Sequence, residues 1–273
     1  MHPLLIDLMA DYTERHANTL RSPDTAKYHG YRIGPWLEGR RASEVREVVA
    51  SIRDDLLKAY KPATVNRSLG ALQKALSMAW EQNKTTSDYS SLVKRVPEHN
   101  ARTVSLTIDQ VQQLADCASA PVRAAIWIAL FTGCRRGEIM AMRPADISAT
   151  EITVKAGNTK TLKTRTIPII APVRPWLAQL PLNVNFEGLK SGFRRAREAA
   201  GMPHVTFHDL RRSCGTLLIQ QGVSLHVVSK LLGHSSTTVT ERVYAHLAHQ
   251  QLKAGLDTLA ALHGVHEDQA KQG

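Results

Sequence analysis

Six side chains between residues 132 and 246 of this 273-residue chain could act together on a phosphate ester. They are two guanidiniums, an ammonium, two imidazoles and a phenol, in the order Arg135, Lys160, His208, Arg211, His234 and Tyr244. Cationic groups stabilise the charge that develops on a transferred phosphoryl group. Imidazoles can move protons, and a phenol can attack phosphorus. The set therefore suits phosphoryl transfer.

Each residue also has an ordinary structural explanation. Arg135 follows the expected end of a helix, where it could interact with the helix dipole or with solvent. Lys160 could protect an edge strand from aggregation. His208 could cap a helix, and Tyr244 could belong to a hydrophobic core. Only their occurrence together, in this order and in one basic segment, favours the chemical interpretation.

The six residues lie in four local patterns. These read Thr-Gly-Cys-Arg-Arg-Gly-Glu at 132–138, Lys-Thr-Leu-Lys-Thr-Arg-Thr-Ile-Pro at 160–168, His-Asp-Leu-Arg at 208–211, and Leu-Gly-His at 232–234 with Tyr244 ten residues after the histidine. In this order they resemble the tyrosine recombinases, the phage integrase family of site-specific DNA recombinases. Residues 61–67 (Lys-Pro-Ala-Thr-Val-Asn-Arg) resemble the family's core-binding domain more loosely.

The resemblance implies a mainly α fold with a small antiparallel β-sheet. Residues 1–98 would form a helical core-binding domain of the SAM-like type. Residues 99–273 would form the α+β catalytic domain, ending in a C-terminal helix and tail. A polar, Pro-containing run at 94–100 supports a boundary there.

The resemblance makes Tyr244 the nucleophile that attacks a DNA phosphodiester and forms a covalent 3′-phosphotyrosine. It makes Arg135 and Arg211 a pair that clamps the phosphate. Rigid bidentate guanidiniums match the charge on its nonbridging oxygens better than lysines would. Since a free tyrosine has a pKa of about 10, attack near neutral pH needs a proton acceptor, which the resemblance assigns to His208.

The same resemblance gives Lys160 the role of protonating the departing 5′-oxygen and His234 that of a hydrogen-bond donor to the phosphate. Glu138, three residues beyond Arg135, would support an active-site arginine or histidine, or else cap its own helix.

No cofactor or metal is expected. The sequence has no phosphate-binding glycine loop and no acidic cluster suited to magnesium, which disfavours a two-metal nuclease. His204 and His208 are four residues apart, and His246 and His249 three apart, spacings that zinc could use. Because the resemblance assigns His208 elsewhere, we do not expect a zinc site.

The charge favours DNA as the partner. Lys and Arg number 35 against 24 Asp and Glu, a net charge of +11, and the composition is that of a globular protein. Residues 155–212 hold 11 basic and three acidic residues. Basic residues that we expect to contact DNA are Arg67, Lys74, Lys163, Arg165, Arg194, Arg195 and Arg197. Arg67 and Lys74, seven apart on a predicted helix, could instead form a solvated face.

We expect a cytoplasmic protein, in a bacterial nucleoid or a phage-infected host, that does not engage membranes. The chain shows neither a signal-like N-terminus nor a membrane-spanning apolar stretch. Cys117, Cys134 and Cys214 lack any paired spacing, which fits a reducing compartment.

The expected partners are double-stranded recombination sites, bound as a homotetramer on two DNA sites, which accessory DNA-bending or directionality proteins could join. Integration or excision of phage or mobile-element DNA is the preferred event. Resolution of chromosome or plasmid dimers uses the same chemistry and is the alternative. A type IB topoisomerase-like enzyme that relaxes DNA at a single site and a catalytically silent DNA-binding protein fit less well.

Apolar spacing predicts the elements that position these residues. In the first domain it predicts helices near residues 4–9 and 65–79. In the second, Thr107 and Gln110 form a capping-box pattern at a helix start. Further on, we expect a buried helix over 124–131 that ends at Gly133, strands near 152–154, 159–161 and 165–169, and helices over 189–200, 210–220, 225–232 and 239–259.

Overall fold

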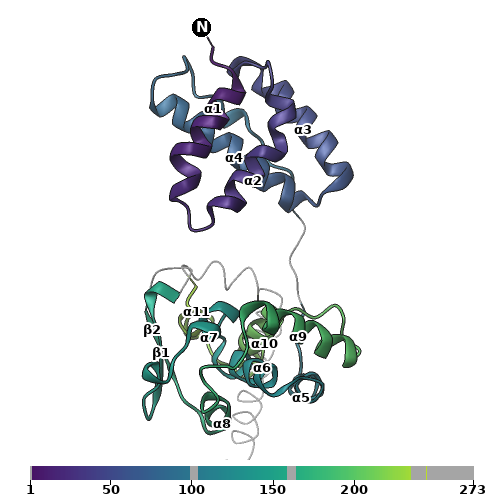
Figure 1. Ribbon diagram of the computed structural model, residues 1–273, viewed down its shortest axis with the longest axis vertical. Coiled ribbons are helices and arrows are strands. Elements are labelled where there is room, and N and C mark those ends of the chain that lie inside the picture. The colour runs from purple at the N-terminus through teal and green to yellow at the C-terminus, as the bar shows by residue number, and fades with distance from the viewer. Residues whose placement is uncertain (1, 99–103, 159–163, 235–243, 245–273) are drawn as a thin grey trace, which may run out of the picture. The chain divides into compact units, whose positions relative to one another are not determined.

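The structure, a computed structural model, describes residues 2–98, 104–158, 164–234 and 244. It divides into two compact units, residues 1–100 and 101–273 (Figure 1). The expected fold class is confirmed, because both units are mainly helical and the second carries a two-stranded antiparallel sheet. Within the described ranges, no helix is both long enough and apolar enough to cross a membrane.

The N-terminal unit is built from helices around its own hydrophobic core. The α-helices of residues 2–98 are α1 (Leu5–Asp11), α2 (Pro23–Leu37), α3 (Val45–Ala59) and α4 (Pro62–Glu81), and the shorter turns are a π-helix (Tyr12–His16) and 3₁₀ helices at Ala17–Thr19, Ala42–Glu44 and Tyr89–Leu92. Pro62 begins α4, where its missing N–H costs nothing. The predicted apolar stripe of α4 is buried against α1, α2 and α3.

The C-terminal unit packs its helices around α6. Its described elements are α5 (Ile108–Asp116), α6 (Ala120–Thr132), α7 (Arg136–Ala141), β1 (Glu151–Val154), β2 (Arg165–Pro168), α8 (Arg174–Leu177), α9 (Phe186–Ala199), α10 (Phe207–Gln220) and α11 (Leu225–Leu232), with 3₁₀ helices at Pro144–Asp146, Ala156–Asn158 and Ala171–Val173. Apart from Arg123 and Thr132, helix α6 consists of apolar residues, and α5, α7, α8, α9 and α10 all pack on it. The capping box of α5 is confirmed, since the Thr107 hydroxyl accepts from Gln110 N–H at 3.2 Å and the Gln110 side chain accepts from Thr107 N–H at 2.9 Å.

Strands β1 and β2 pair antiparallel in the register Ile152 with Ile167 and Val154 with Arg165. Because side chains alternate along a strand, Arg165 and Ile167 share one face, and Ile167 is buried. The expected third strand at 159–161 lies outside the described residues, as do Lys160, Lys163 and all of the expected C-terminal helix except Tyr244.

Gly133 ends α6 in the left-handed conformation, with φ 64° and ψ 14°, as expected. This turn leads the chain from the buried helix directly into the segment that carries Arg135. A Cβ at Gly133 would lie 2.5 Å from Leu232 Cδ2, so the turn also lets α11 approach closely.

We expect Gly133→Ala to lower the free energy of unfolding by about 1–2 kcal/mol from the left-handed conformation alone, with a further cost from the displaced Leu232. Urea unfolding of the full chain followed by circular dichroism measures the change. Gly137→Ala in α7 is the matched control. Its Cβ would meet nothing within 4 Å, so this variant should be as stable as the parent or more so. Equal stability of the two variants would contradict the conclusion that Gly133 is required for the left-handed turn at the end of α6.

Candidate active site

A cavity of about 430 Å³ in the C-terminal unit brings together three of the six predicted residues: Arg135, His208 and Arg211. Arg135 precedes the first residue of α7, and the other two lie one turn apart in the first half of α10. The remaining wall residues are Cys134, Arg136, Gly137, Phe186, Thr206 and Phe207. The two guanidiniums and the imidazole therefore face one space, as the phosphate-clamp prediction requires.

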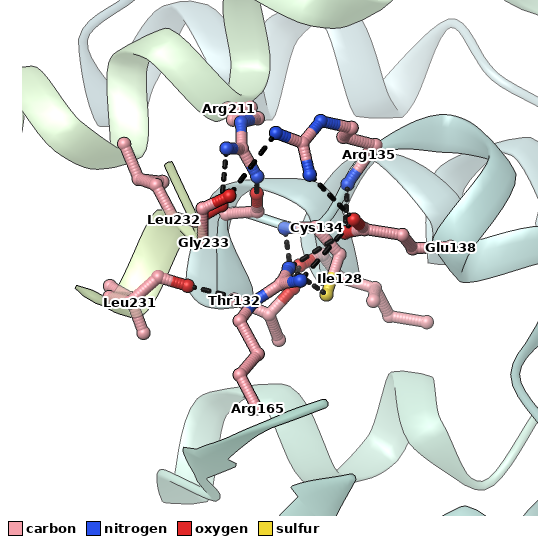
Figure 2. Close-up of polar contacts among 11 residues, drawn as sticks. Ile128, Thr132, Cys134, Arg135, Glu138, Arg165, Arg211, Leu231, Leu232 and Gly233 are labelled. Atoms are coloured by element: carbon pink, nitrogen blue, oxygen red, sulfur yellow. Dashed lines mark hydrogen bonds and ion pairs between the residues drawn. The ribbon is translucent and has the colours of Figure 1, made fainter. Parts of the chain in front are cut away.

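Glu138 fixes Arg135. The carboxylate accepts from Arg135 N–H at 2.9 Å and from Arg135 Nη1 at 2.7 Å, so it caps the helix and also orients the side chain. Both roles left open from the sequence are thus present. Figure 2 shows Arg165 reaching the same carboxylate from β2, with Nη2 to Oε2 at 2.7 Å. Burial by itself raises the pKa of Glu138, but the hydrogen bonds from Arg165 and Arg135 outweigh it and hold that pKa below its usual range.

Arg211 is held by backbone rather than by a carboxylate. Only 2% of the residue is exposed, and its guanidinium donates to Gly133 O at 2.6 Å and to Leu232 O. Burial, followed by repulsion from Arg135, lowers the pKa of Arg211 to about 10. A cation in this position is incompletely compensated by the protein, so an anion bound in the cavity would be strongly stabilised.

Both predicted histidines lie in the field of these arginines. His208 is exposed, yet partial loss of hydration, followed by repulsion from Arg211, lowers its pKa. His234 follows Gly233, which ends α11 with φ 63°; burial, followed by Arg211 and Arg135, lowers its pKa to about 4. Both imidazoles are therefore neutral at pH 7, and each can accept a proton.

Tyr244 is buried, with 2% of the residue exposed, and packs with Ile219, Val228 and Leu232. A Cβ at Gly215 would overlap its hydroxyl, so the phenol lies directly against α10, one turn beyond Arg211. Its hydroxyl donates to Arg212 O at 3.4 Å. Burial raises the pKa of Tyr244 to about 12, with Arg211 acting in the opposite direction.

The predicted DNA contacts fall into two groups. Arg67, Arg194 and Arg195 are exposed. Lys74 is half-buried, and its Nζ lies 3.6 Å from Glu81 Oε1. Arg165, by contrast, has only 10% of its side chain exposed and bonds Glu138 instead of facing outward. Its position on the buried face of β2 explains this departure from the prediction. Lys160 and Lys163 lie outside the described residues.

Arg197 also turns inward in part, because its Nη1 donates to Val205 O at 2.6 Å.

Arg136 is a cavity residue that the sequence interpretation did not select. Its guanidinium lies 4.0 Å from the ring centre of Phe186 and borders a second cavity of about 390 Å³. That cavity also contains Lys190, Arg194 and Arg197 from α9, and it shares Arg136, Thr206 and Phe207 with the first. The helical spacing of 190, 194 and 197 was the available signal.

Residues 104–251 match the sequence model described as the phage integrase family. A protein of Thermosipho africanus named tyrosine recombinase is 25% identical over 90% of this chain and 96% of its own length. The fold is similar to that of lambda integrase in a tetramer bound to a Holliday junction, with a TM-score of 0.72, 19% identity, and coverage of 89% of this chain and 77% of that one. It is also similar to the Tn1549 transposon integrase in complex with transposon right-end DNA, with a TM-score of 0.69, 17% identity, and coverage of 94% and 100%.

Proposed function

We propose that this chain, which belongs to the phage integrase family of tyrosine-type site-specific DNA recombinases, holds the phosphate to be cut between Arg135 and Arg211. As a member of that family it is an enzyme that cleaves and rejoins DNA strands. The observation that carries the proposal is the convergence of these two guanidiniums and His208 on one cavity. Arg211 is almost fully buried there, and within the described residues its guanidinium donates to the carbonyls of Gly133 and Leu232.

Tyr244 supplies the nucleophile in this proposal. Its phenol oxygen bonds to phosphorus, the bond from phosphorus to the 5′-oxygen breaks, and the cut strand stays attached through a 3′-phosphotyrosine. The phenol proton passes to His208, and a proton from Lys160 goes to the leaving 5′-oxygen. Rejoining reverses these transfers with the 5′-hydroxyl of a second strand, so no energy source is needed.

The arginine pair stabilises the charge that grows on the nonbridging oxygens during attack. Arg211 is fixed by the carbonyls of Gly133 and Leu232, and Arg135 by Glu138, so neither guanidinium must reorganise when the charge develops. His234, at the end of α11, donates to the same phosphate in this proposal. Burial and then Arg211 lower the pKa of His208, which favours the unprotonated imidazole that can take the phenol proton.

The second cavity extends the phosphate path away from the cut. Arg136, Lys190 and Arg194 border it, and we assign it to the phosphates of the neighbouring DNA backbone. On the N-terminal unit, the exposed Arg67 of α4 is the corresponding backbone contact, with Lys74 on the same helix.

Arg194→Gln should weaken binding to DNA and reduce the slope of log K against log salt by about one, the effect of losing one phosphate contact. Arg195→Gln is the comparison variant: Arg195 is also exposed on α9 and is expected from the sequence to contact DNA, but it does not border the cavity. Filter binding across a salt series measures both. If the two variants give the same slope, the cavity does not bind the DNA backbone.

The enzyme acts as a homotetramer on two double-stranded sites in the cytoplasm, and the event is integration or excision of phage or mobile-element DNA. Tyrosine recombinases named XerC and XerD are also among the relatives of this chain, so dimer resolution stays the alternative event. On one supercoiled plasmid carrying two sites, recombination yields excised or inverted DNA, whereas an enzyme acting at single sites yields only relaxed circles. Accessory DNA-bending or directionality proteins could be needed for either integration or excision.

The chemistry is tested with a nicked suicide substrate. A binding site is first selected from a random duplex library, and a nick beside the cut then lets the 5′-hydroxyl fragment diffuse away. We expect a covalent protein–DNA adduct on a denaturing gel, with the DNA attached to Tyr244 in the tryptic peptide. Absence of an adduct on DNA that the protein binds tightly, or attachment to another residue, would overturn the proposal.

A further inference from the structure

Arg165 occupies an unusual position for a charged residue. It opens β2 on the face that also buries Ile167, and 10% of its side chain is exposed. Long cationic side chains are seldom this deeply buried without a partner, so its contacts indicate what it does.

The guanidinium of Arg165 joins three segments (Figure 2). It forms a bidentate pair with Glu138 of α7, with Nη2 to Oε2 at 2.7 Å and Nη1 to Oε1 at 3.3 Å. Its Nε donates to Leu231 O of α11 at 3.0 Å, and its Nη2 lies 3.7 Å from the Cys134 sulfur. Every nitrogen of the guanidinium is thus used within the protein, which leaves Arg165 poorly placed to bind DNA.

The contacts with Glu138 and Leu231 lead to groups that bind the phosphate in the proposed function. Each Glu138 oxygen accepts from both Arg165 and Arg135, so the same carboxylate is fixed from both sides. On α11, a Cβ at Gly233 would lie 3.0 Å from Arg165 Cδ, which shows how tightly the turn before His234 packs on this side chain.

We propose that Arg165 is a positioning residue that holds Arg135, through Glu138, and the His234 turn in one fixed arrangement. Removing Arg165 would leave the buried Glu138 carboxylate paired with Arg135 alone. It would also remove the hydrogen bond that holds the end of α11. Arg135 would then be drawn toward Glu138 rather than toward the DNA phosphate. The inference rests on the proposed roles of Arg135 and His234.

The same contacts predict a pH effect. The charged and titratable groups around Glu138 are Arg135, Arg165, Arg211 and Cys134. Without Arg165, its hydrogen bonds and charge no longer lower the pKa of Glu138 against burial, so that pKa rises. The clamp needs the ionised Glu138 carboxylate. As the pH is lowered, the cleavage rate of Arg165→Met should therefore begin to fall at a higher pH than the rate of the parent protein does.

The experiment measures single-turnover cleavage and DNA affinity of Arg165→Met, Arg165→Lys, Glu138→Gln and their double variant on the suicide substrate. We expect Arg165→Met to cleave about 10–100-fold more slowly, with affinity and salt slope unchanged. Arg165→Lys should recover part of the rate, because lysine restores the positive charge but cannot form the bidentate pair with Glu138. Arg165→Met with Glu138→Gln should be no slower than the slower single variant, because the two residues act as a unit.

Arg174→Met is the matched control, since this exposed arginine of α8 donates to Ala149 O, away from the cavity, and its loss should not change the rate. A salt slope reduced by about one in Arg165→Met would make Arg165 a DNA contact and overturn the inference, as would a normal rate with an unshifted pH profile. If Arg165→Met does not fold, the rate and pH profile of Arg165→Lys decide by the same criteria. Absence of an adduct with the parent protein would instead remove the proposed function itself.

Discussion

Tyr244→Phe is expected to abolish covalent attachment to DNA while leaving DNA binding and stability nearly unchanged. The substitution removes only the phenol oxygen, which is the atom that bonds to phosphorus in the proposed reaction. The hydrogen bond that this oxygen donates to Arg212 O is 3.4 Å long, so its loss should cost little. The adduct assay on the suicide substrate measures attachment, and gel shift measures binding.

Tyr12→Phe is the matched control. Tyr12 is also buried, with 4% of the residue exposed, but it lies in the N-terminal unit, so the variant should form the adduct at the parent rate. Persistence of the adduct in Tyr244→Phe would show that another residue is the nucleophile. Loss of DNA binding in that variant would point to a structural role for the phenol instead.

The position of Tyr244 is compatible with both explanations that its sequence context allowed. The residue is part of a buried cluster, as a core residue would be, and its hydroxyl also lies against Gly215 of α10, one turn from Arg211. With a pKa of about 12, the phenol is ionised in only about one molecule in 10⁵ at pH 7. Attack in the proposed reaction therefore requires a proton acceptor.

Features of the chain that depend on neighbours in sequence were predictable. The capping box of α5 needs only Thr107 and Gln110, and the end of α6 needs only the left-handed conformation that Gly133 adopts readily. The stripe of α4 likewise follows from helical spacing. In each case the decisive interaction spans no more than a few residues, so the local pattern contains the required information.

The contacts that organise the site could not be predicted in the same way. Arg165 meets Glu138 across 27 positions and Leu231 across 66, and a basic residue in a basic segment is more simply interpreted as a DNA contact. The alternation of β2, which places Arg165 on the face of the apolar Ile167, was the one clue available. The resemblance supplied residue types and order, but the division of one carboxylate between two arginines requires the folded arrangement.

Arg211→Ala should slow cleavage by a factor on the order of 10²–10³, the effect of removing one preorganised stabiliser of transition-state charge. The side chain loses its place between two backbone carbonyls, and the phosphate loses its most deeply buried cation. Arg211→Lys should recover little, because a single ammonium cannot bind both carbonyls and the phosphate in the geometry of a guanidinium.

If Arg211 only stabilised the fold, its loss would affect stability rather than the cleavage rate per folded molecule. Arg123→Ala is the control that distinguishes this structural role from a catalytic one. Arg123 also donates to backbone carbonyls, those of Ala115, Asp116 and Ala118, but it does not border the cavity. Its loss should reduce stability without a large change in the cleavage rate per folded molecule. Comparable rate losses in the two variants would mean that Arg211 acts through the fold alone.

The pH profile of Arg211→Ala gives an independent test of the same role. Arg211 lowers the pKa of both His208 and His234, so its removal raises both. A proton acceptor must be unprotonated, and a His208 with a raised pKa becomes protonated at a higher pH. The acid limb of the cleavage rate should therefore move toward alkaline pH in Arg211→Ala but stay in place in Arg123→Ala. An unshifted limb would show that Arg211 does not control the ionisation of the histidine that accepts the phenol proton.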